Sequence, residues 1–328
     1  VPNQRAVVSK VAVLEKAEDG LVFGSGMAAI STVLFAHLKP GDHAIFQADL
    51  YGGTFHFVAA ELKAFGVEIV FASGVEQFKS SLRPNTRLLY VESPSNPLLR
   101  CIDLAAVAQL ARSHGLLSII DNTFATPINQ TPIEFGIDAV VHSATKYLNG
   151  HSDVNAGILV SSKRVVERVG EYAISHGGTL DSHACYQLER GLKTLAIRVR
   201  TQNDSAGRLA RFLETHPAVS RVNYPGLPNH PDHGIASQQM RGFGGMLSFE
   251  LRQPAQVEGM LKRFRLVTPA LSLGGVETLV CVPSQTSHRT MSPEERRQAG
   301  IAEGLVRLSV GVEDVEDLIE DFEQALGA

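Results

Sequence analysis

The sequence predicts an α/β protein with a mainly parallel sheet covered by helices on both faces, followed by a smaller α+β domain. Three observations predict this class. Short apolar runs alternate with amphipathic helical patterns as far as Asn149, which is typical of strand–helix–strand units. Several runs end in a polar or glycine-rich cluster, as parallel strands do beside a ligand site. After His151 the strands are fewer and more widely separated, which indicates a second domain.

The first 149 residues contain most of the expected sheet. A helical pattern covers residues 6–16, and a short strand at 21–23 leads into a glycine loop and a helix that Pro40-Gly41 ends. Another helix runs to Phe65, and a further one covers residues 103–114. Strands are predicted at residues 43–46, 67–71, 87–92, 116–120 and 139–141.

In the rest of the chain, strand and helix patterns no longer alternate regularly. We predict a strand at 157–160, a helix at 163–172 and one long helix from His183 to His216 that leads into the second domain. Later strands are expected at 246–251 and 305–310, and an amphipathic helix at 315–326. We therefore assign residues 1–197 to a large domain and residues 198–328 to a small C-terminal domain.

Composition narrows the class of partner. The chain has 328 residues, 44% hydrophobic and 20% charged, as in soluble globular proteins. Its net charge is -4 and no basic block stands out, so we expect neither a nucleic-acid partner nor membrane attachment. No apolar run approaches the roughly 18 to 20 residues of a membrane span. Small molecules are the expected ligands.

The cysteines and the first residues add two expectations. Cys101, Cys185 and Cys281 are widely spaced and lack zinc-site spacing, so we expect no metal site and free thiols in the reducing cytoplasm. The chain opens at Val1 without Met, directly in a helical pattern. We therefore expect that an N-terminal arm is missing from the sequence.

An acid and a lysine follow two neighbouring strands in the stretch from Leu116 to Asn149. Asp121 ends one apolar run, and His142-Ser143-Ala144-Thr145-Lys146 follows the next. A pyridoxal phosphate (PLP) enzyme needs a lysine for a Schiff base and a carboxylate beside the pyridinium nitrogen, and hydroxyls such as those of Ser143 and Thr145 suit a phosphate. On these residues alone, a turn-capping Asp121 and a solvated Lys146 remain an open alternative.

The glycine loop Gly24-Ser25-Gly26-Met27-Ala28-Ala29 leads into a helix N-terminus, which favours a phosphate. The loop also satisfies G-x-G-x-x-A, and Asp42 lies near the distance at which a dinucleotide fold carries its ribose acid. Against that alternative, a helix and a turn precede the glycines, and Asp42 sits in a turn rather than at a strand end. Tyr51, in the next loop, could stack on a planar ring or pack against its helix.

Taken together, the motifs identify the chain as similar to the Cys/Met-metabolism family of PLP enzymes. They are GSGMAAI, DLYGGT, ESPSNP, DNTFATP, SATKYLNGH, RGLKTL, GFGGMLSFEL, SLGGVETL and GLVRLSVGVED, and they span essentially the whole chain. The resemblance implies the aspartate-aminotransferase-like fold (fold type I), with a mainly parallel seven-stranded-type sheet and a smaller α+β domain. It also implies PLP as cofactor and a homotetramer built from dimers that share active sites.

The resemblance also implies roles for individual residues. Lys146 would bind PLP covalently and move protons, Asp121 would pair with the ring nitrogen, and Tyr51 would stack on the ring and assist proton transfer. Arg307 would bind the substrate carboxylate. The other implied site residues are Gly26, Met27, Ser143 and Thr145 at the phosphate, Asn96 beside the cofactor oxygen and the substrate, Glu92 supporting the pocket, and Ser272 near Lys146.

The implied activity is a carbon–sulfur lyase of trans-sulfuration, which converts methionine or cystathionine to 2-oxobutanoate, ammonia and a thiol. A γ-replacement transferase, cystathionine γ-synthase or O-acylhomoserine sulfhydrylase, is the alternative, and a non-catalytic member of the fold is a remote one. Leu271 favours an apolar distal group, whereas Gly53 replaces the cysteine common in methionine γ-lyases. His56 departs from the arginine of some cystathionine lyases, and the family's N-terminal Tyr-x-Arg is absent.

Overall fold

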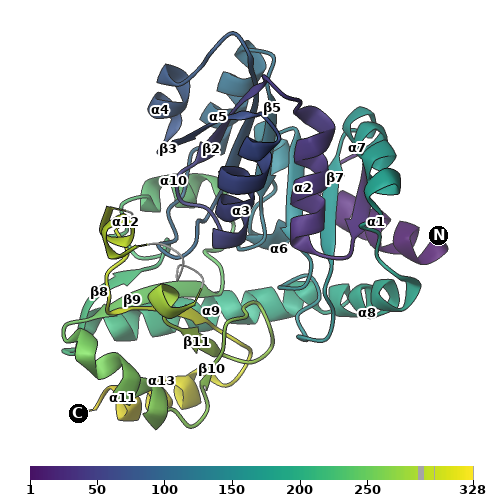
Figure 1. The fold of residues 1–328 in the computed structure, drawn as a ribbon. Helices are drawn as coiled ribbons and strands as arrows, with labels where there is room; N and C mark the ends of the chain where they lie inside the picture. Colours follow the sequence, from purple (N-terminus) through teal and green to yellow (C-terminus); the bar gives the residue numbers. More distant parts are fainter. Residues whose placement is uncertain (287–291, 299, 328) are drawn as a thin grey trace.

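The computed structural model describes residues 1–286, 292–298 and 300–327. It contains a large seven-stranded sheet and a smaller five-stranded sheet, which form the upper and lower parts of Figure 1. Within the described residues, no helix combines the length and apolar composition that crossing a membrane requires.

The seven-stranded sheet has the order β1-β7-β6-β5-β4-β2-β3. The strands from β6 to β3 run parallel to one another, whereas β7 is antiparallel to both β6 and β1. The sheet is therefore mainly parallel, as predicted. Its strands are β1 (Asp19–Phe23), β2 (His43–Gln47), β3 (Glu68–Ala72), β4 (Thr86–Glu92), β5 (Leu117–Asp121), β6 (Ala139–Ser143) and β7 (Gly157–Ser161).

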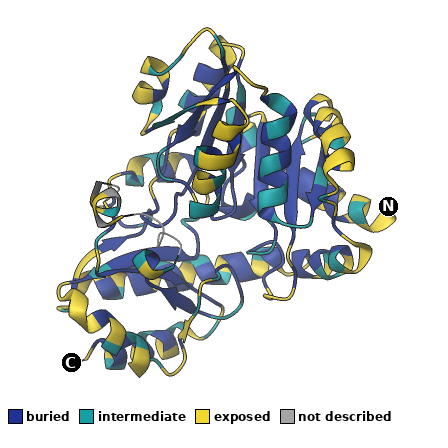
Figure 2. Ribbon diagram, in the orientation of Figure 1, coloured by how far each residue is buried: buried dark blue, intermediate teal, exposed yellow. Residues whose placement is uncertain are grey.

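Helices cover both faces of this sheet, and successive strand residues point into different cores. Ile119 of β5 belongs to the core under α2 and α7, and the next residue, Ile120, belongs to the core under α1, α5 and α8. Figure 2 shows the buried strands between helices whose outer faces are exposed. These helices are α1 (Pro2–Glu15), α2 (Gly26–His37), α5 (Leu104–Ser113), α7 (Lys163–His176) and α8 (Ser182–Leu192).

Shorter elements complete the large unit. The helix expected to run to Phe65 begins as α3 (Gly52–His56) and continues as a π-helical segment, Phe57–Leu62. The sequence patterns did not indicate α4 (Val75–Ser80), α6 (Thr126–Asn129) or the 3₁₀ turn Pro132–Phe135.

The second sheet has the order β10-β11-β12-β9-β8 and is antiparallel except for the β10–β11 pair. It packs against α9, α11 and α13 around a separate apolar core. The predicted strands at 246–251 and 305–310 and the closing helix are present, but three short strands escaped prediction. The elements are β8 (Val219–Asn223), β9 (Met246–Leu251), β10 (Thr268–Pro269), β11 (Leu279–Cys281), β12 (Leu305–Ser309), α9 (Leu195–Thr215), α10 (His233–Gln239), α11 (Val257–Arg263), α12 (Pro293–Gln298) and α13 (Val315–Leu326).

The prediction of a single long helix from His183 to His216 is wrong, because the helix is interrupted between α8 and α9. The amides of Lys193 and Thr194 bond back to carbonyls only three residues earlier, which tightens and ends α8. Helix α9 then joins the two units: Leu195 and Val199 belong to the core of the large unit, and the segment 206–213 belongs to that of the small unit. The boundary at 197/198 falls in the first turn of α9 and stays a prediction.

The position of the glycine loop argues against the dinucleotide alternative. Strand β1, which precedes the loop, lies at the sheet edge and pairs antiparallel with β7, whereas a dinucleotide fold places its glycines after a parallel strand. Asp42 accepts a hydrogen bond from the Lys39 amide at 3.0 Å within its turn, so this acid stabilises the turn instead of ending a strand.

Candidate active site

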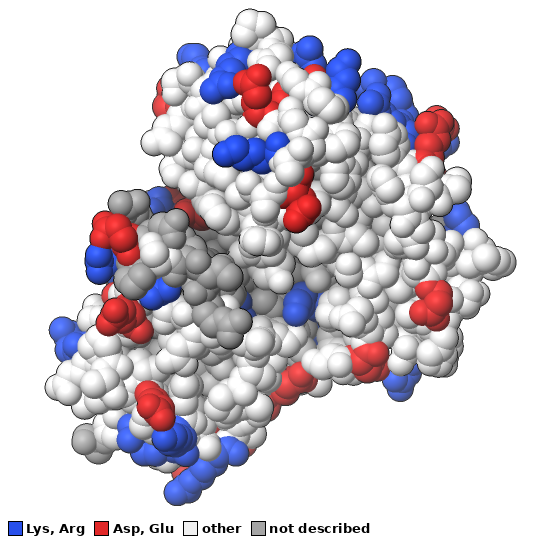
Figure 3. Space-filling model, viewed as in Figure 1, with Lys and Arg blue, Asp and Glu red and all other residues white. Residues whose placement is uncertain are grey.

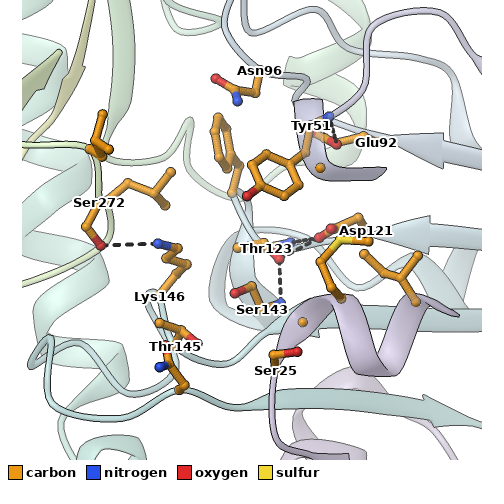
Figure 4. A pocket seen from close by; sticks show the side chains of 18 of the residues that line it. Ser25, Tyr51, Glu92, Asn96, Asp121, Thr123, Ser143, Thr145, Lys146 and Ser272 are labelled. Atoms are coloured by element: carbon orange, nitrogen blue, oxygen red, sulfur yellow. Dashed lines mark hydrogen bonds between the residues drawn. The ribbon is translucent and has the colours of Figure 1, made fainter. Parts of the chain in front are cut away.

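A pocket of about 610 Å³ lies where the carboxyl ends of β4, β5 and β6 meet the N-terminus of α2 and the loop before β11. All ten predicted cofactor, catalytic and substrate residues line it: Gly26, Met27, Tyr51, Asn96, Asp121, Ser143, Thr145, Lys146, Ser272 and Arg307. Figure 4 labels seven of them, all but Gly26, Met27 and Arg307. Figure 3 shows the surface hollowed between the two units on this face. The fold therefore brings the predicted residues together, and their roles remain predictions.

Lys146 lies in the turn that follows β6 and reaches across to the small unit. Its Nζ donates a hydrogen bond to the Ser272 hydroxyl at 3.1 Å (Figure 4). Burial lowers the pKa of the Lys146 amine, and the positive charge of Arg307 lowers it further. The amine is thus easier to deprotonate than a surface lysine, which suits both nucleophilic attack and proton removal.

Asp121 is buried at the end of β5 and is held by Thr123. The Thr123 hydroxyl and amide both donate to Asp121 Oδ1, at 2.5 and 2.9 Å. The same hydroxyl accepts a hydrogen bond from the Ser143 amide at 2.8 Å, so it joins the ends of β5 and β6. Burial raises the pKa of Asp121, and the bonds from Thr123 oppose that rise. A cationic N–H group placed beside Asp121 would stabilise its charged form.

Glu92 ends strand β4, which neighbours β5, and it pairs in register with Asp121 of β5. Burial raises the pKa of Glu92 well above its usual value, and the charge of Asp121 adds to the rise. Glu92 Oε2 accepts the Tyr51 amide at 2.8 Å, which anchors the loop that carries the Tyr51 ring. Tyr51 is 45% exposed and lines the pocket, so its ring is accessible to a planar group there.

The N-terminus of α2 forms the anion-binding end of the pocket. The amides of Gly26 and Met27 have no acceptor among the described residues, and helix N-termini attract anions. A Cβ on Gly26 would lie 2.8 Å from Ser143 Cβ, so only glycine lets α2 approach β6 this closely. The Thr145 hydroxyl donates to the Ala156 carbonyl at 3.2 Å.

Arg307 lies on β12 and is 4% exposed. Its guanidinium donates to Asn96 Oδ1 at 3.2 Å and to the carbonyl of Leu271 at 2.9 Å. No carboxylate lies within ion-pair distance of it in the part of the chain that the structure describes. A buried guanidinium that faces a pocket without an acidic partner is suited to a substrate carboxylate.

Thr123 and Ser25 are among the pocket residues that escaped prediction. Thr123 was not singled out, although Asp-x-Thr directly after a strand is the pattern of a side chain that bonds the backbone two residues on. Ser25 caps α2 by accepting the Ala28 amide at 3.0 Å, and it also lines the pocket. A serine just before a helix is an N-cap signal, and this one leaves its hydroxyl proton for a ligand.

The residues present fit PLP. The free amides of α2 and the hydroxyls of Ser25 and Ser143 suit its phosphate. The buried carboxylate of Asp121, which has no cationic partner among the described residues, suits the protonated ring nitrogen. Lys146 is the amine for its aldehyde, and Tyr51 offers a ring face.

The family model and the similar proteins described below agree on one family of PLP-dependent enzymes. The family model described as Cys/Met metabolism PLP-dependent enzyme matches residues 1–327. The L-methionine γ-lyase of Fusobacterium nucleatum subsp. nucleatum is 44% identical over 99% of this chain and 84% of its own. The cystathionine β-lyase of Lactococcus lactis subsp. cremoris is 43% identical over 99% and 86%. A crystal structure of cystathionine γ-lyase from Lactobacillus plantarum, in complex with L-serine, has a TM-score of 0.96 at 42% identity, over 99% of this chain and 86% of that one. This similarity confirms the predicted fold class.

Proposed function

Because the chain belongs to the Cys/Met metabolism family of PLP-dependent enzymes, we propose that it eliminates the γ-substituent of methionine or cystathionine. Membership confirms the resemblance seen in the motifs, makes PLP the cofactor and makes the chain a PLP-dependent carbon–sulfur lyase of sulfur amino-acid metabolism. The choice of substrate and of elimination site is our proposal. The single observation that carries it is the pocket in which Lys146, Asp121 and Arg307 converge.

Substrate binding depends on Arg307. Its guanidinium takes the α-carboxylate, and Asn96, which already accepts a bond from Arg307 at 3.2 Å, keeps the guanidinium directed into the pocket. The amino acid is thereby held with its Cα hydrogen toward Lys146. Holding two reacting groups in this way removes much of the entropic barrier of the step.

Proton transfer depends on Lys146. PLP, when bound, supplies an electron sink for the electrons released at Cα. Lys146 Nζ removes the proton from Cα, passes that proton on, and as a free amine again removes one from Cβ, after which the Cγ–S bond breaks and the sulfur leaves as a thiolate. Asp121 would keep the proton on the ring nitrogen when PLP is bound, and in this proposal the Tyr51 hydroxyl gives a proton to the leaving sulfur. The lowered pKa of Lys146 supports its role as the base.

The walls of the pocket favour an apolar distal group. Phe124, Leu271 and Leu273 line it, and the side chain of Leu271 is 65% exposed at its rim. A thioether methyl group buries well against such residues. This observation ranks methionine before cystathionine.

The test combines a spectrum with product analysis. Full-length protein loaded with PLP should show the visible band of the lysine-bound cofactor, and Lys146→Ala should lose it. L-methionine, L-cystathionine and an O-acylhomoserine are then added in turn while 2-oxobutanoate and pyruvate are measured. 2-Oxobutanoate from a thioether alone supports the proposal. Pyruvate from cystathionine would show β-elimination instead, and turnover that requires an added thiol would show a transferase.

We also propose that the enzyme is a cytoplasmic homotetramer built from dimers that share active sites. Its three cysteines are free and buried, which suits a reducing compartment. Large apolar side chains such as Ile174, Ile197 and Val13 are 69–83% exposed, as at surfaces that a second copy covers. Sedimentation velocity of the holoenzyme tests the assembly, and a monomer at micromolar concentration would contradict it.

A further inference from the structure

Arg198 is a buried cation that the chemistry above does not use. It lies in the first turn of α9 and is 5% exposed. No carboxylate lies within ion-pair distance of its guanidinium in residues 1–286, 292–298 and 300–327. Burial lowers the pKa of Arg198 to about 10, so the group is still charged at neutral pH. A buried charge of this kind persists only where fixed dipoles replace its water.

The dipoles come from the segment that carries the reactive lysine. Arg198 Nη1 donates to the Tyr147 carbonyl at 2.8 Å, and Nη2 donates to the Gly191 carbonyl at 2.9 Å. A longer contact of 3.5 Å joins Nη2 to the Leu148 carbonyl. Nε donates to the Thr194 hydroxyl at 3.0 Å. One side chain therefore links the turn after β6 to the junction of α8 and α9.

Two of these carbonyls, those of Tyr147 and Leu148, lack a backbone donor among the described residues. The turn is closed by bonds from the Asn149 amide to the Ala144 carbonyl and from the Gly150 amide to the Lys146 carbonyl. Gly191, in the last turn of α8, presents its carbonyl at the negative end of the helix dipole, where it also accepts the Thr194 amide and hydroxyl. Arg198 is therefore the donor to the two carbonyls of the turn and adds a charged donor at Gly191.

The packing also explains two glycines in motifs that the proposed reaction does not use. Gly150, in SATKYLNGH, has a φ of +77°, and a Cβ there would lie 2.0 Å from Arg198 Nη1. Gly191, in RGLKTL, would place a Cβ 2.3 Å from the Asn149 carbonyl oxygen. Both motifs therefore need glycine because the turn, α8 and Arg198 are in direct contact.

We propose that Arg198 is a positioning residue, which fixes the turn of Lys146 so that Nζ returns to the same place in every catalytic cycle. The inference rests on the proposed role of Lys146, whose amine has to reach the reacting carbons of the substrate from its place on the turn after β6. Its only side-chain hydrogen bond in the described structure is the one to Ser272. The position of Nζ thus depends on how firmly the backbone from 146 to 150 is held.

The experiment compares Arg198→Met, which removes the donors, with Arg198→Lys, which keeps the charge but not the planar fork. Arg200→Met is the matched control, because Arg200 lies on the same helix and is exposed. Turnover is expressed per bound cofactor, and the visible band is titrated with pH. Both Arg198 variants should lower kcat about a hundredfold with little change in KM. The pH at which half of the visible absorption band is lost should increase, because a more mobile turn exposes Lys146 to water.

Two results would overturn the inference. In the first, the Arg198 variants lose thermal stability, but their kcat per bound cofactor and the midpoint pH of their visible band equal those of the natural chain. Arg198 would then have a purely structural role. The other is an Arg198→Lys variant that behaves like the natural chain. If Arg198→Met does not fold, Gly150→Ala carries the same expectation, since its methyl displaces the guanidinium. A band that persists in Lys146→Ala would instead refute the proposed function itself.

Discussion

Replacing Thr123 with valine should separate cofactor affinity from protein stability. The change keeps the shape of the side chain but removes the hydroxyl that donates to Asp121 Oδ1 at 2.5 Å and accepts the Ser143 amide at 2.8 Å. A hydrogen bond to a charged group is worth about 1.5–3 kcal/mol, and a buried amide left unpaired costs about 1–3 kcal/mol.

The two losses act on different measurements. Without the hydroxyl the pKa of Asp121 rises further, because burial already raises it and the Thr123 bonds oppose that rise. Asp121 then holds the ring nitrogen less well, and the Kd for PLP should rise about tenfold to a hundredfold. The unpaired Ser143 amide weakens the apo and loaded forms alike, so it should lower the Tm of the apoenzyme by several degrees without changing Kd.

The assay is a fluorescence titration of apoenzyme with PLP, together with thermal unfolding of the apoenzyme. Thr123→Ser is the control, since it keeps the hydroxyl and should bind PLP as the natural chain does. If Thr123→Val binds PLP as tightly as Thr123→Ser, the hydroxyl does not support Asp121 and the reasoning is wrong.

Three further changes test other parts of the site. Arg307→Lys keeps the charge but loses the two-pronged donor, so KM for the amino acid should rise about tenfold or more, and steady-state kinetics with an unchanged KM would contradict the carboxylate role. The raised pKa of Asp121 means that its contribution to apoenzyme stability is present below the ordinary carboxyl pKa and is lost as pH rises through the folded one. Asp121→Asn should therefore flatten the fall in apoenzyme Tm as pH rises above the ordinary carboxyl pKa, and a slope equal to that of the natural chain speaks against this assignment. Gly26→Ala places a methyl group 2.8 Å from Ser143 Cβ, so α2 must move and the Kd for PLP should rise about tenfold. Gly170→Ala, in a helix where a Cβ meets nothing within 4 Å, should bind PLP normally, and equal Kd values for the two alanine variants would exclude a tight phosphate cradle.

Local pattern was sufficient for the large sheet. Its central strands are buried on both faces, so they appear as short apolar runs, and the runs of β4, β5 and β6 end at the pocket. Asp121 and Lys146 could be singled out for that reason, since they follow two such runs. The motifs then supplied the family and, with it, residues such as Ser272, whose own surroundings indicate nothing.

Distant packing decided what the patterns could not show. The break between α8 and α9 lies where Gly191 closely approaches the Asn149 backbone, and no proline marks it in the sequence. The sequence does not show that β7 is antiparallel either, because a buried strand has the same apolar pattern whichever way it runs. A buried pair with 2.6 Å between Glu15 Oε1 and His142 Nε2 joins positions 127 residues apart.

The sequence by itself therefore determined the strands of the large sheet, the family and the identity of the candidate reactive groups, because these depend on side-chain chemistry and on spacing within a few residues. Only the tertiary structure decided how Lys146 is held. Ser272 and Arg307 reach its side from the small unit, and Arg198 supports its turn from α9. These contacts join segments tens to hundreds of residues apart, and their hydrogen bonds exist only once both sheets and α9 have packed.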